Sequence, residues 1–302
     1  MSAIDYDILI NQIQRNLPTL PTIVNELTNI LQNPDASTFA VEEVMTSDQS
    51  MTMKILRVAN TSFYRGGRDE RVTDANEAIG SLGFEKIRNV ILTTSVFKIF
   101  KDDSAENRFS LEELWKHSLG VASASRNLAN WLGKTWHERA YTCGLVHDIG
   151  KVARFKLDEF DDTNLFIQDS QFALDKKINF FKSELVNQTP RHDYLGYLIC
   201  KNWGLSRYVE GVVRWHHEPN PEARQKVMSE EAGEVIDLVI LANWAVNHLK
   251  FGFSGHDSPD HPSDALLQRL NLSPSHLDQV LESISAELEL TSEFCSMLDS
   301  ES

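Results

Sequence analysis

Histidines and one adjacent aspartate are the residues best suited to chemistry in this sequence. Ten histidines are present, and several lie inside apolar runs, where an unpartnered imidazole would lose hydration without compensation. His147 and Asp148 are neighbours, and so are His216 and His217. Imidazole nitrogens and a carboxylate are the ligands that zinc, iron and manganese accept in proteins. The pattern predicts a metal site in which Asp148 completes the shell of one ion or bridges two.

Lys151 follows the His147–Asp148 pair by one helical turn. Residues at that spacing share a helix face, so its ammonium group could hold a phosphate oxygen or the bridging solvent. A buried histidine beside an aspartate is also a common structural arrangement, in which hydrogen bonds satisfy both groups without metal. The residues by themselves leave both interpretations open.

Helices are the elements expected to position these residues. Apolar residues recur at three- and four-residue steps along most of the chain, and no alternating pattern typical of strands competes with them. We expect helices at residues 23–31, 39–45, 53–59, 74–79, 87–97, 115–132, 140–155, 172–186, 193–202, 207–215, 235–249 and 277–290. His117 would lie on the long helix at 115–132, and residues 252–262 form a turn-rich loop. The predicted fold class is all-α.

A polar, charged stretch at residues 101–110 is the best candidate boundary within the chain. It would separate an N-terminal helical subdomain, residues 1–105, from a second subdomain, residues 106–302. The second subdomain would carry the candidate metal site and end in an acidic helical tail. Each part is long enough to bury a core of its own.

Composition excludes several classes of function. The 302 residues include 29 Lys and Arg against 44 Asp and Glu, a net charge of −15, which repels nucleic acid and anionic membrane surfaces. Residues 74–100 superficially fit a helix-turn-helix DNA reader. However, Lys86 and Arg88 are too few against this charge, and the apolar residues are more simply core positions. We therefore expect no DNA partner.

Cysteine content and hydropathy predict the cellular compartment of the protein. Cys143, Cys200 and Cys295 are few, widely spaced and odd in number, so neither a disulfide framework nor a cysteine zinc site is indicated. No stretch approaches the ~18 apolar residues of a membrane span, and the first residues lack the features of a signal peptide. We expect a cytoplasmic protein with no membrane partner.

Five short strings together resemble a known family. They are LPTLP at 17–21, KILRVAN at 54–60, AIGSLG at 78–83, HDIGK at 147–151 and HHEP at 216–219. In this order and spacing the sequence resembles the HDOD family, the HD-related output domains of bacterial signalling proteins, over about residues 15–250. The resemblance implies an all-helical, HD-domain-like bundle. In it an N-terminal helical part packs on a degenerate relative of the metal-dependent HD phosphohydrolase domain.

The resemblance also implies a set of site residues. Compared with HD and HD-GYP phosphohydrolases, metal ligands would be His117, His147, Asp148, His192, His216, His217 and, in the place of the final aspartate, Asn243. Asp148 and Lys151 would be the catalytic residues, and the cofactor would be one or two divalent ions of iron, manganese, zinc or magnesium. Asn243 departs from the family pattern, because an amide oxygen is a neutral and weaker ligand than a carboxylate.

Two functions follow from these expectations. The first is metal-dependent hydrolysis of a phosphate ester or a nucleotide. The second is a noncatalytic signalling output or scaffold module with a vestigial or ligand-sensing pocket, which would bind a signalling protein partner. The remaining histidines are expected to be solvated and receive no role: His137, His248, His256, His261 and His276.

Overall fold

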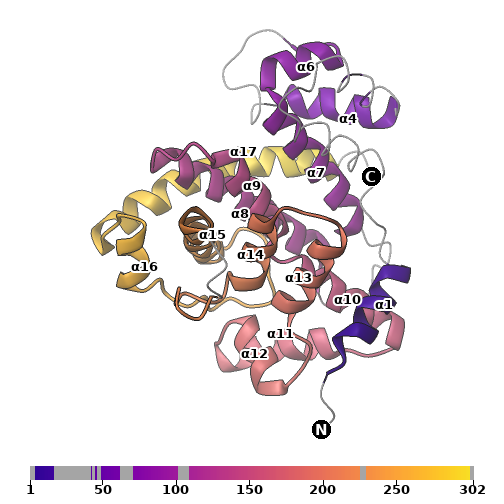
Figure 1. Cartoon of the computed structure of the whole chain (residues 1–302), viewed down its shortest axis with the longest axis vertical. Helices are drawn as coiled ribbons and strands as arrows, with labels where there is room; N and C mark the ends of the chain where they lie inside the picture. Colours follow the sequence, from indigo (N-terminus) through magenta and orange to yellow (C-terminus); the bar gives the residue numbers. More distant parts are fainter. Residues whose placement is uncertain are drawn as a thin grey trace. The chain divides into compact units, whose positions relative to one another are not determined.

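The computed structural model describes residues 4–16, 42, 45, 49–61, 71–100, 109–224 and 229–299. All regular secondary structure within these residues is helical (Figure 1). The all-α prediction is therefore confirmed. The helix expected at 23–31, and most of the one expected at 39–45, lie outside the described residues. No helix in the described part of the chain combines the length and apolarity that crossing a bilayer requires.

The chain divides into two compact units by its internal contacts. One unit comprises residues 1–19 and 99–288, and the other comprises residues 20–98 and 289–302. The first unit therefore begins with the N-terminal segment, and the second includes the end of the chain. The subdomain boundary expected after residue 105 stays a prediction.

The described part of the second unit includes α4 (Gln49–Ala59), α6 (Ala75–Leu82), residues 84–98 of α7 (Phe84–Phe100) and the last part of α17 (Leu277–Asp299). Helix α4 packs against α6. The expected helix after Asp74 is confirmed, because the Asp74 side chain accepts a hydrogen bond from the backbone N–H of Glu77. Gly83 ends α6 with a φ of 80°, and its N–H donates to the carbonyl of Ile79.

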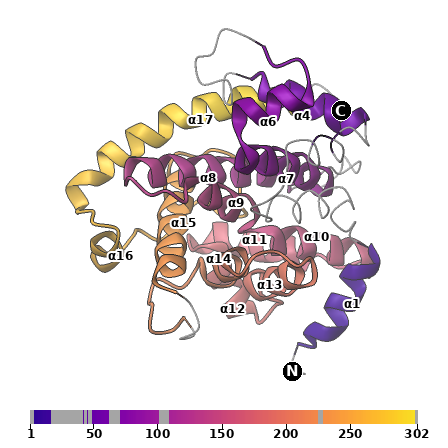
Figure 2. The same ribbon diagram turned by 45° about the horizontal axis from the view of Figure 1, so that its top comes forward.

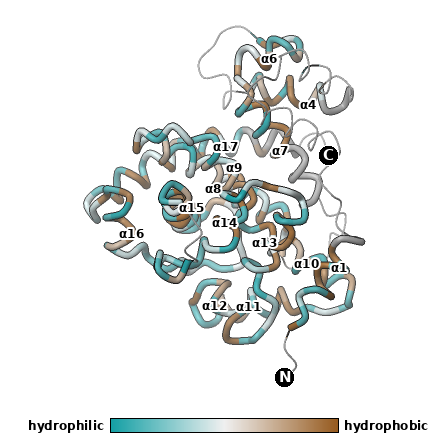
Figure 3. The backbone as a smooth tube through the Cα atoms, viewed as in Figure 1, coloured by the Kyte–Doolittle hydropathy of each residue, from teal (hydrophilic) through white to brown (hydrophobic). Residues whose placement is uncertain are grey.

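The core of the first unit is built by α8 (Leu111–Trp131), α9 (His137–Val146) and α15 (Glu230–His248). Helix α8 packs along α9, and α15 crosses both, as Figure 2 shows. Their buried faces are mainly apolar, and hydrophobic stretches along α8 and α9 stand out in Figure 3. Burial of these faces supplies most of the stability that holds the helices together.

A second group of helices faces this core and carries the remaining site residues. It comprises α10 (Ile149–Asp161), α13 (His192–Asn202) and α14 (Arg207–Trp215), with α11 (Leu165–Lys176) and α12 (Phe180–Asn187) beside them. Helix α1 (Tyr6–Asn16) contacts α10 and α13. The unit continues through α16 (Asp264–Arg269), a 3-10 turn (Pro274–His276) and the first half of α17 (Leu277–Asp299).

Gly150 lets α10 and α13 approach closely. A Cβ atom at this position would lie 1.9 Å from the backbone oxygen of His192. No side chain can occupy that space, so glycine is required for the start of α13 to sit against the start of α10. This contact places His192 beside Asp148.

Two predicted helices are in fact pairs of helices. The helix expected at 140–155 is interrupted, because α9 ends at Val146 and α10 begins at Ile149, with His147 and Asp148 between them. The helix expected at 172–186 is also divided, since Lys177 adopts a left-handed φ of 53° and Asn179 caps α12. Both predictions of one continuous helix were wrong, because apolar periodicity does not reveal a change in helix axis within a buried run.

Candidate metal centre

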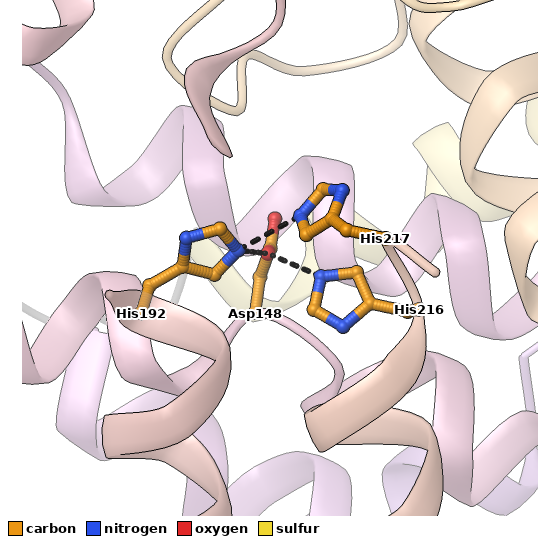
Figure 4. Close-up of side chains that lie close together, drawn as sticks. All are labelled: Asp148, His192, His216 and His217. Carbon is orange, nitrogen blue, oxygen red and sulfur yellow. Dashed lines mark hydrogen bonds and ion pairs between the residues drawn. The ribbon is translucent and has the colours of Figure 1, made fainter. Parts of the chain in front are cut away.

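Asp148 lies at the centre of the predicted ligands. Its buried carboxylate has Oδ2 3.3 Å from His147 Nε2 and 3.8 Å from His117 Nε2. Its Oδ1 lies 3.4 Å from the Nε2 atoms of His192 and His216, as the close-up in Figure 4 shows. These side chains and His217 form two groups that share Asp148: His117, His147 and Asp148, and Asp148, His192, His216 and His217.

Hydrogen bonds on the far side of each ring direct three Nε2 atoms toward Asp148. His147 Nδ1 lies 2.8 Å from the carbonyl of Gly144, and His216 Nδ1 lies 3.0 Å from that of Val213. His192 Nδ1 lies 2.7 Å from a carboxylate oxygen of Glu184. Since these oxygens can only accept, each Nδ1 carries the proton and each neutral ring keeps its lone pair on Nε2. This is the tautomer that a metal ligand requires.

Buried polar atoms without partners also fit a metal ion. Among the described residues, the Nε2 atoms of His117, His147 and His216 and the Oδ1 atom of Asp148 are buried and make no hydrogen bond. Leaving such groups unsatisfied costs about 1–3 kcal/mol each, and one cation in each of the two groups would satisfy all of them. The distance of 2.9 Å between the Nε2 atoms of His192 and His217 also agrees with two ligands of one metal ion. Two nitrogens about 2.1 Å from one ion at right angles are about 3.0 Å apart.

Charge in the cluster favours an ionised aspartate among mostly neutral imidazoles. Burial raises the pKa of Asp148, but His147 and Lys151 outweigh burial and hold that pKa well below its usual range. Burial lowers the pKa of His117, and it lowers the pKa of His216 to about 4. Burial also disfavours protonated His192, but Glu184 and Asp148 outweigh this effect and raise its pKa. Because the pKa of His192 is raised, a metal ion would compete with a proton there.

Lys151 lies where the sequence predicted, one turn beyond the pair. Its ammonium nitrogen is 2.7 Å from Asp148 Oδ2, and the side chain is buried. The lysine balances the carboxylate charge at the same edge of the cluster. Its catalytic role stays a prediction.

Sequence reasoning missed the group that holds His192. Glu184 is fully buried, and its Oε1 accepts hydrogen bonds from Arg154, at 2.7 Å, and from the backbone N–H of His192, at 3.0 Å. Arg154 also donates to Asp169, at 2.7 Å. Nothing in the sequence singles out Glu184, because its role depends on the packing of α12 beside the start of α13.

Asn243 borders a cavity beside His216 and His217. The side-chain nitrogen of Asn247 donates both to the backbone oxygen of Asn243, at 2.9 Å, and to its Oδ1, at 2.8 Å. This pair of contacts turns the amide oxygen of Asn243 toward Asn247 and leaves its NH2 group on the other side. The assignment of Asn243 as a metal ligand stays a prediction.

His256 is buried, so the expectation that it is solvated was wrong. It is 4% exposed, and it lines the cavity beside His216. Its loop packs inward because Gly252 permits a close approach to α8, where a Cβ atom would lie 2.3 Å from the backbone nitrogen of His117. Burial lowers the pKa of His256 to about 3. The glycines at 252 and 255 are the sequence signal that could have indicated this packing.

Comparison with known proteins identifies the family of the chain. The HDOD domain matches residues 17–219, about two thirds of the chain. The chain belongs to the HDOD family. An uncharacterised protein of Treponema pallidum is 21% identical to this HDOD chain over 235 residues, which are 78% of the chain but only 43% of that relative. The chain therefore spans less than half of the length of the curated relative that it matches.

Two crystal structures share the fold of this HDOD protein. A protein of Marinobacter aquaeolei suggested to act in signal transduction has a TM-score of 0.72 at 17% identity, covering 99% of this chain and 62% of the other. A protein of Shewanella amazonensis suggested to be a metal-dependent phosphohydrolase has a TM-score of 0.59 at 19% identity, covering 94% and 98%. At these identities the likeness establishes the fold alone.

Proposed function

We propose that this HDOD protein is a metal-dependent phosphohydrolase that acts on a phosphate ester or a nucleotide. The observation that carries the proposal is the convergence of histidine Nε2 atoms on one buried aspartate. One ion would be held by Asp148, His192, His216 and His217, and a second by His117, His147 and the shared Asp148. When bound, such ions lower the pKa of a coordinated water and neutralise phosphoryl oxygens.

Residues of the chain itself would orient the metal ligands and bind the phosphate. Asp148 orients the ligand nitrogens around one point and supplies the negative charge between them. Lys151, 2.7 Å from Asp148, is a cation at the edge of the cluster, positioned to hold a phosphate oxygen once a metal shares the carboxylate. The surrounding apolar helices limit access of water to this charge.

A noncatalytic signalling module is the second candidate, and two features favour it. Asn243 stands where the resemblance expects a carboxylate, so the cluster lacks one negative charge. The ammonium group of Lys151 already neutralises Asp148 without metal. In this interpretation the cluster is a vestigial or ligand-sensing site, and the protein would act by binding a signalling partner.

Metal content and phosphatase activity test the first candidate. We expect protein purified without chelator to contain a divalent metal and to hydrolyse a generic phosphate ester, and we expect Asp148→Asn to lose both. The matched control is Asp237→Asn, because Asp237 is also buried but pairs with Arg224 and Arg269. Wild-type protein that takes up no manganese, iron or zinc, or an Asp148→Asn variant that keeps its metal, would contradict the proposal.

A further inference from the structure

A cavity of about 140 Å³ opens beside the ligand pair His216 and His217. Asn243 and His256 line it and are both more than nine-tenths buried. Trp244 forms part of the wall, and the exposed residues Asp260 and His261 also line it. The resemblance assigns nothing to this space beyond Asn243 and the two histidines.

Hydrogen bonds behind the wall determine which donors and acceptors remain for a ligand. Asn247 uses the amide oxygen of Asn243, and no described residue accepts a hydrogen bond from the remaining NH2 group. Ser254 gives its hydroxyl proton to Asn247 Oδ1, at 2.9 Å, so its oxygen accepts from His256 Nδ1, at 3.3 Å. His256 in its neutral form therefore keeps a lone pair on Nε2.

The rim adds further acceptors. His261 Nδ1 donates to the carbonyl of Pro262, at 2.9 Å, which leaves Nε2 of the neutral ring as an acceptor. Asp260 is the carboxylate of the lining, and its oxygens accept from Asn179, at 2.7 Å, and Lys182, at 2.6 Å. The lining thus combines several acceptors with amide donors from Asn243 and its neighbours, a pattern that suits hydroxyl groups because they both donate and accept.

The charge of the lining and the volume of the cavity further restrict the class of ligand. No lysine or arginine is among the described residues that line the cavity, whereas Asp260 is. Lys182 is already paired with Asp260, so among the described lining residues an additional phosphate would meet no unpaired cation. A volume of about 140 Å³ is close to that of an engineered cavity of about 150 Å³ that binds benzene, so the cavity has room for a single ring.

We propose that this cavity binds a hydroxyl-bearing ring, such as a pentose, of a phosphate monoester whose phosphate lies at the His216–His217 end. The inference rests on the proposed function of the metal cluster and adds the class of substrate. Trp244 offers an apolar face to the ring, while Asn243, His256 and His261 bind its hydroxyl groups. Ribose 5-phosphate and the ribose of a nucleoside monophosphate present the same chemistry.

Equilibrium binding to manganese-supplemented protein tests the inference. The probes are inorganic phosphate, phenyl phosphate, ribose 5-phosphate, AMP and ATP, measured by calorimetry. We expect ribose 5-phosphate to bind at least tenfold more tightly than phosphate and phenyl phosphate, and ATP to bind more weakly than AMP. AMP that binds much more tightly than ribose 5-phosphate would identify a nucleoside as the source of the ring. Phenyl phosphate equal to ribose 5-phosphate, or ATP tighter than AMP, would overturn the inference.

Two histidine variants distinguish the contribution of the cavity to binding from that of the metal cluster. His261→Ala removes one acceptor from the rim and should weaken ribose 5-phosphate binding about threefold to tenfold, with no change for inorganic phosphate. His248→Ala is the control, because exposed His248 stacks on Trp244, at 5.3 Å, but does not line the cavity. Equal effects of the two variants would contradict the inference.

The two proposals fail differently. If no probe binds in a metal-dependent way, the proposed function fails. Free ribose at high concentration then tests the cavity alone. Ribose binding that His261→Ala weakens would sustain the inference, and absence of ribose binding would overturn it.

Discussion

Glu184→Gln is the substitution that most directly tests how the cluster is prepared for metal. Oε1 of Glu184 already accepts from Arg154 and from the backbone N–H of His192. A glutamine must keep its oxygen on that side, so its NH2 group would face His192 Nδ1, now 2.7 Å from Oε2. His192 Nδ1 would become an acceptor, and the ring proton would move to Nε2. A protonated Nε2 cannot bind metal.

The expected loss in metal affinity follows from the number of ligands. His192 is one of four residues in its group, with Asp148, His216 and His217. Loss of a partner that orients a ligand typically reduces metal affinity about 10- to 100-fold, or about 1.4–2.8 kcal/mol. The upper end is expected here, because the glutamine blocks the lone pair as well as removing the carboxylate.

Asp169→Asn is the matched control for this experiment. Asp169 is also fully buried and pairs with the same Arg154, but its other hydrogen bonds come from Asn187 and Thr189 rather than from His192. Each variant removes one of the two carboxylates from Arg154, so both should lower the melting temperature of the metal-free protein. In competition titrations with a metal chelator, only Glu184→Gln should bind manganese or zinc more weakly. Unchanged affinity in Glu184→Gln, or an equal loss in Asp169→Asn, would refute the reasoning.

Three further predictions concern the same unit. Asn243→Asp keeps the acceptor for Asn247 and replaces the NH2 group by an oxygen, so we expect higher metal occupancy by elemental analysis. Reduced stability without any gain in metal would mean that Asn243 lies outside the site. His256 has a pKa of about 3 when folded and about 6.5 when unfolded. The unfolded chain therefore binds one more proton between these values, and the metal-free protein should lose about 1.4 kcal/mol per pH unit as the pH falls below 6.5. Urea unfolding at pH 7 and pH 5 should show this slope reduced in His256→Asn, and an identical slope would contradict the assignment. Gly150→Ala should lower the free energy of unfolding by about 1–3 kcal/mol or more, as measured in thermal melts. The reason is that its Cβ would lie 1.9 Å from the backbone oxygen of His192. Gly80→Ala, where a Cβ meets nothing within 4 Å, should be neutral or stabilising, and similar melts for both variants would argue against the close contact.

The sequence by itself determined the helical class and much of the helix layout, and the family resemblance added the histidines that gather around Asp148. Local signals suffice for these features, because apolar periodicity, the Asp74 cap and the Gly83 stop act within a few residues of chain. The candidate ligands were found by residue type and by resemblance. The structure brings the five predicted histidines and Asp148 together.

Only the tertiary structure decided how these residues are oriented. The break between α9 and α10 at the His147–Asp148 pair lies within an apolar run whose periodicity predicts one continuous helix. The bond from His192 to Glu184 and the burial of His256 join segments whose distance in space is set by helix packing. Periodicity reports which face of a helix is buried, but not which neighbour it meets. The tautomers, the pKa shifts and the cavity beside the cluster all depend on those neighbours.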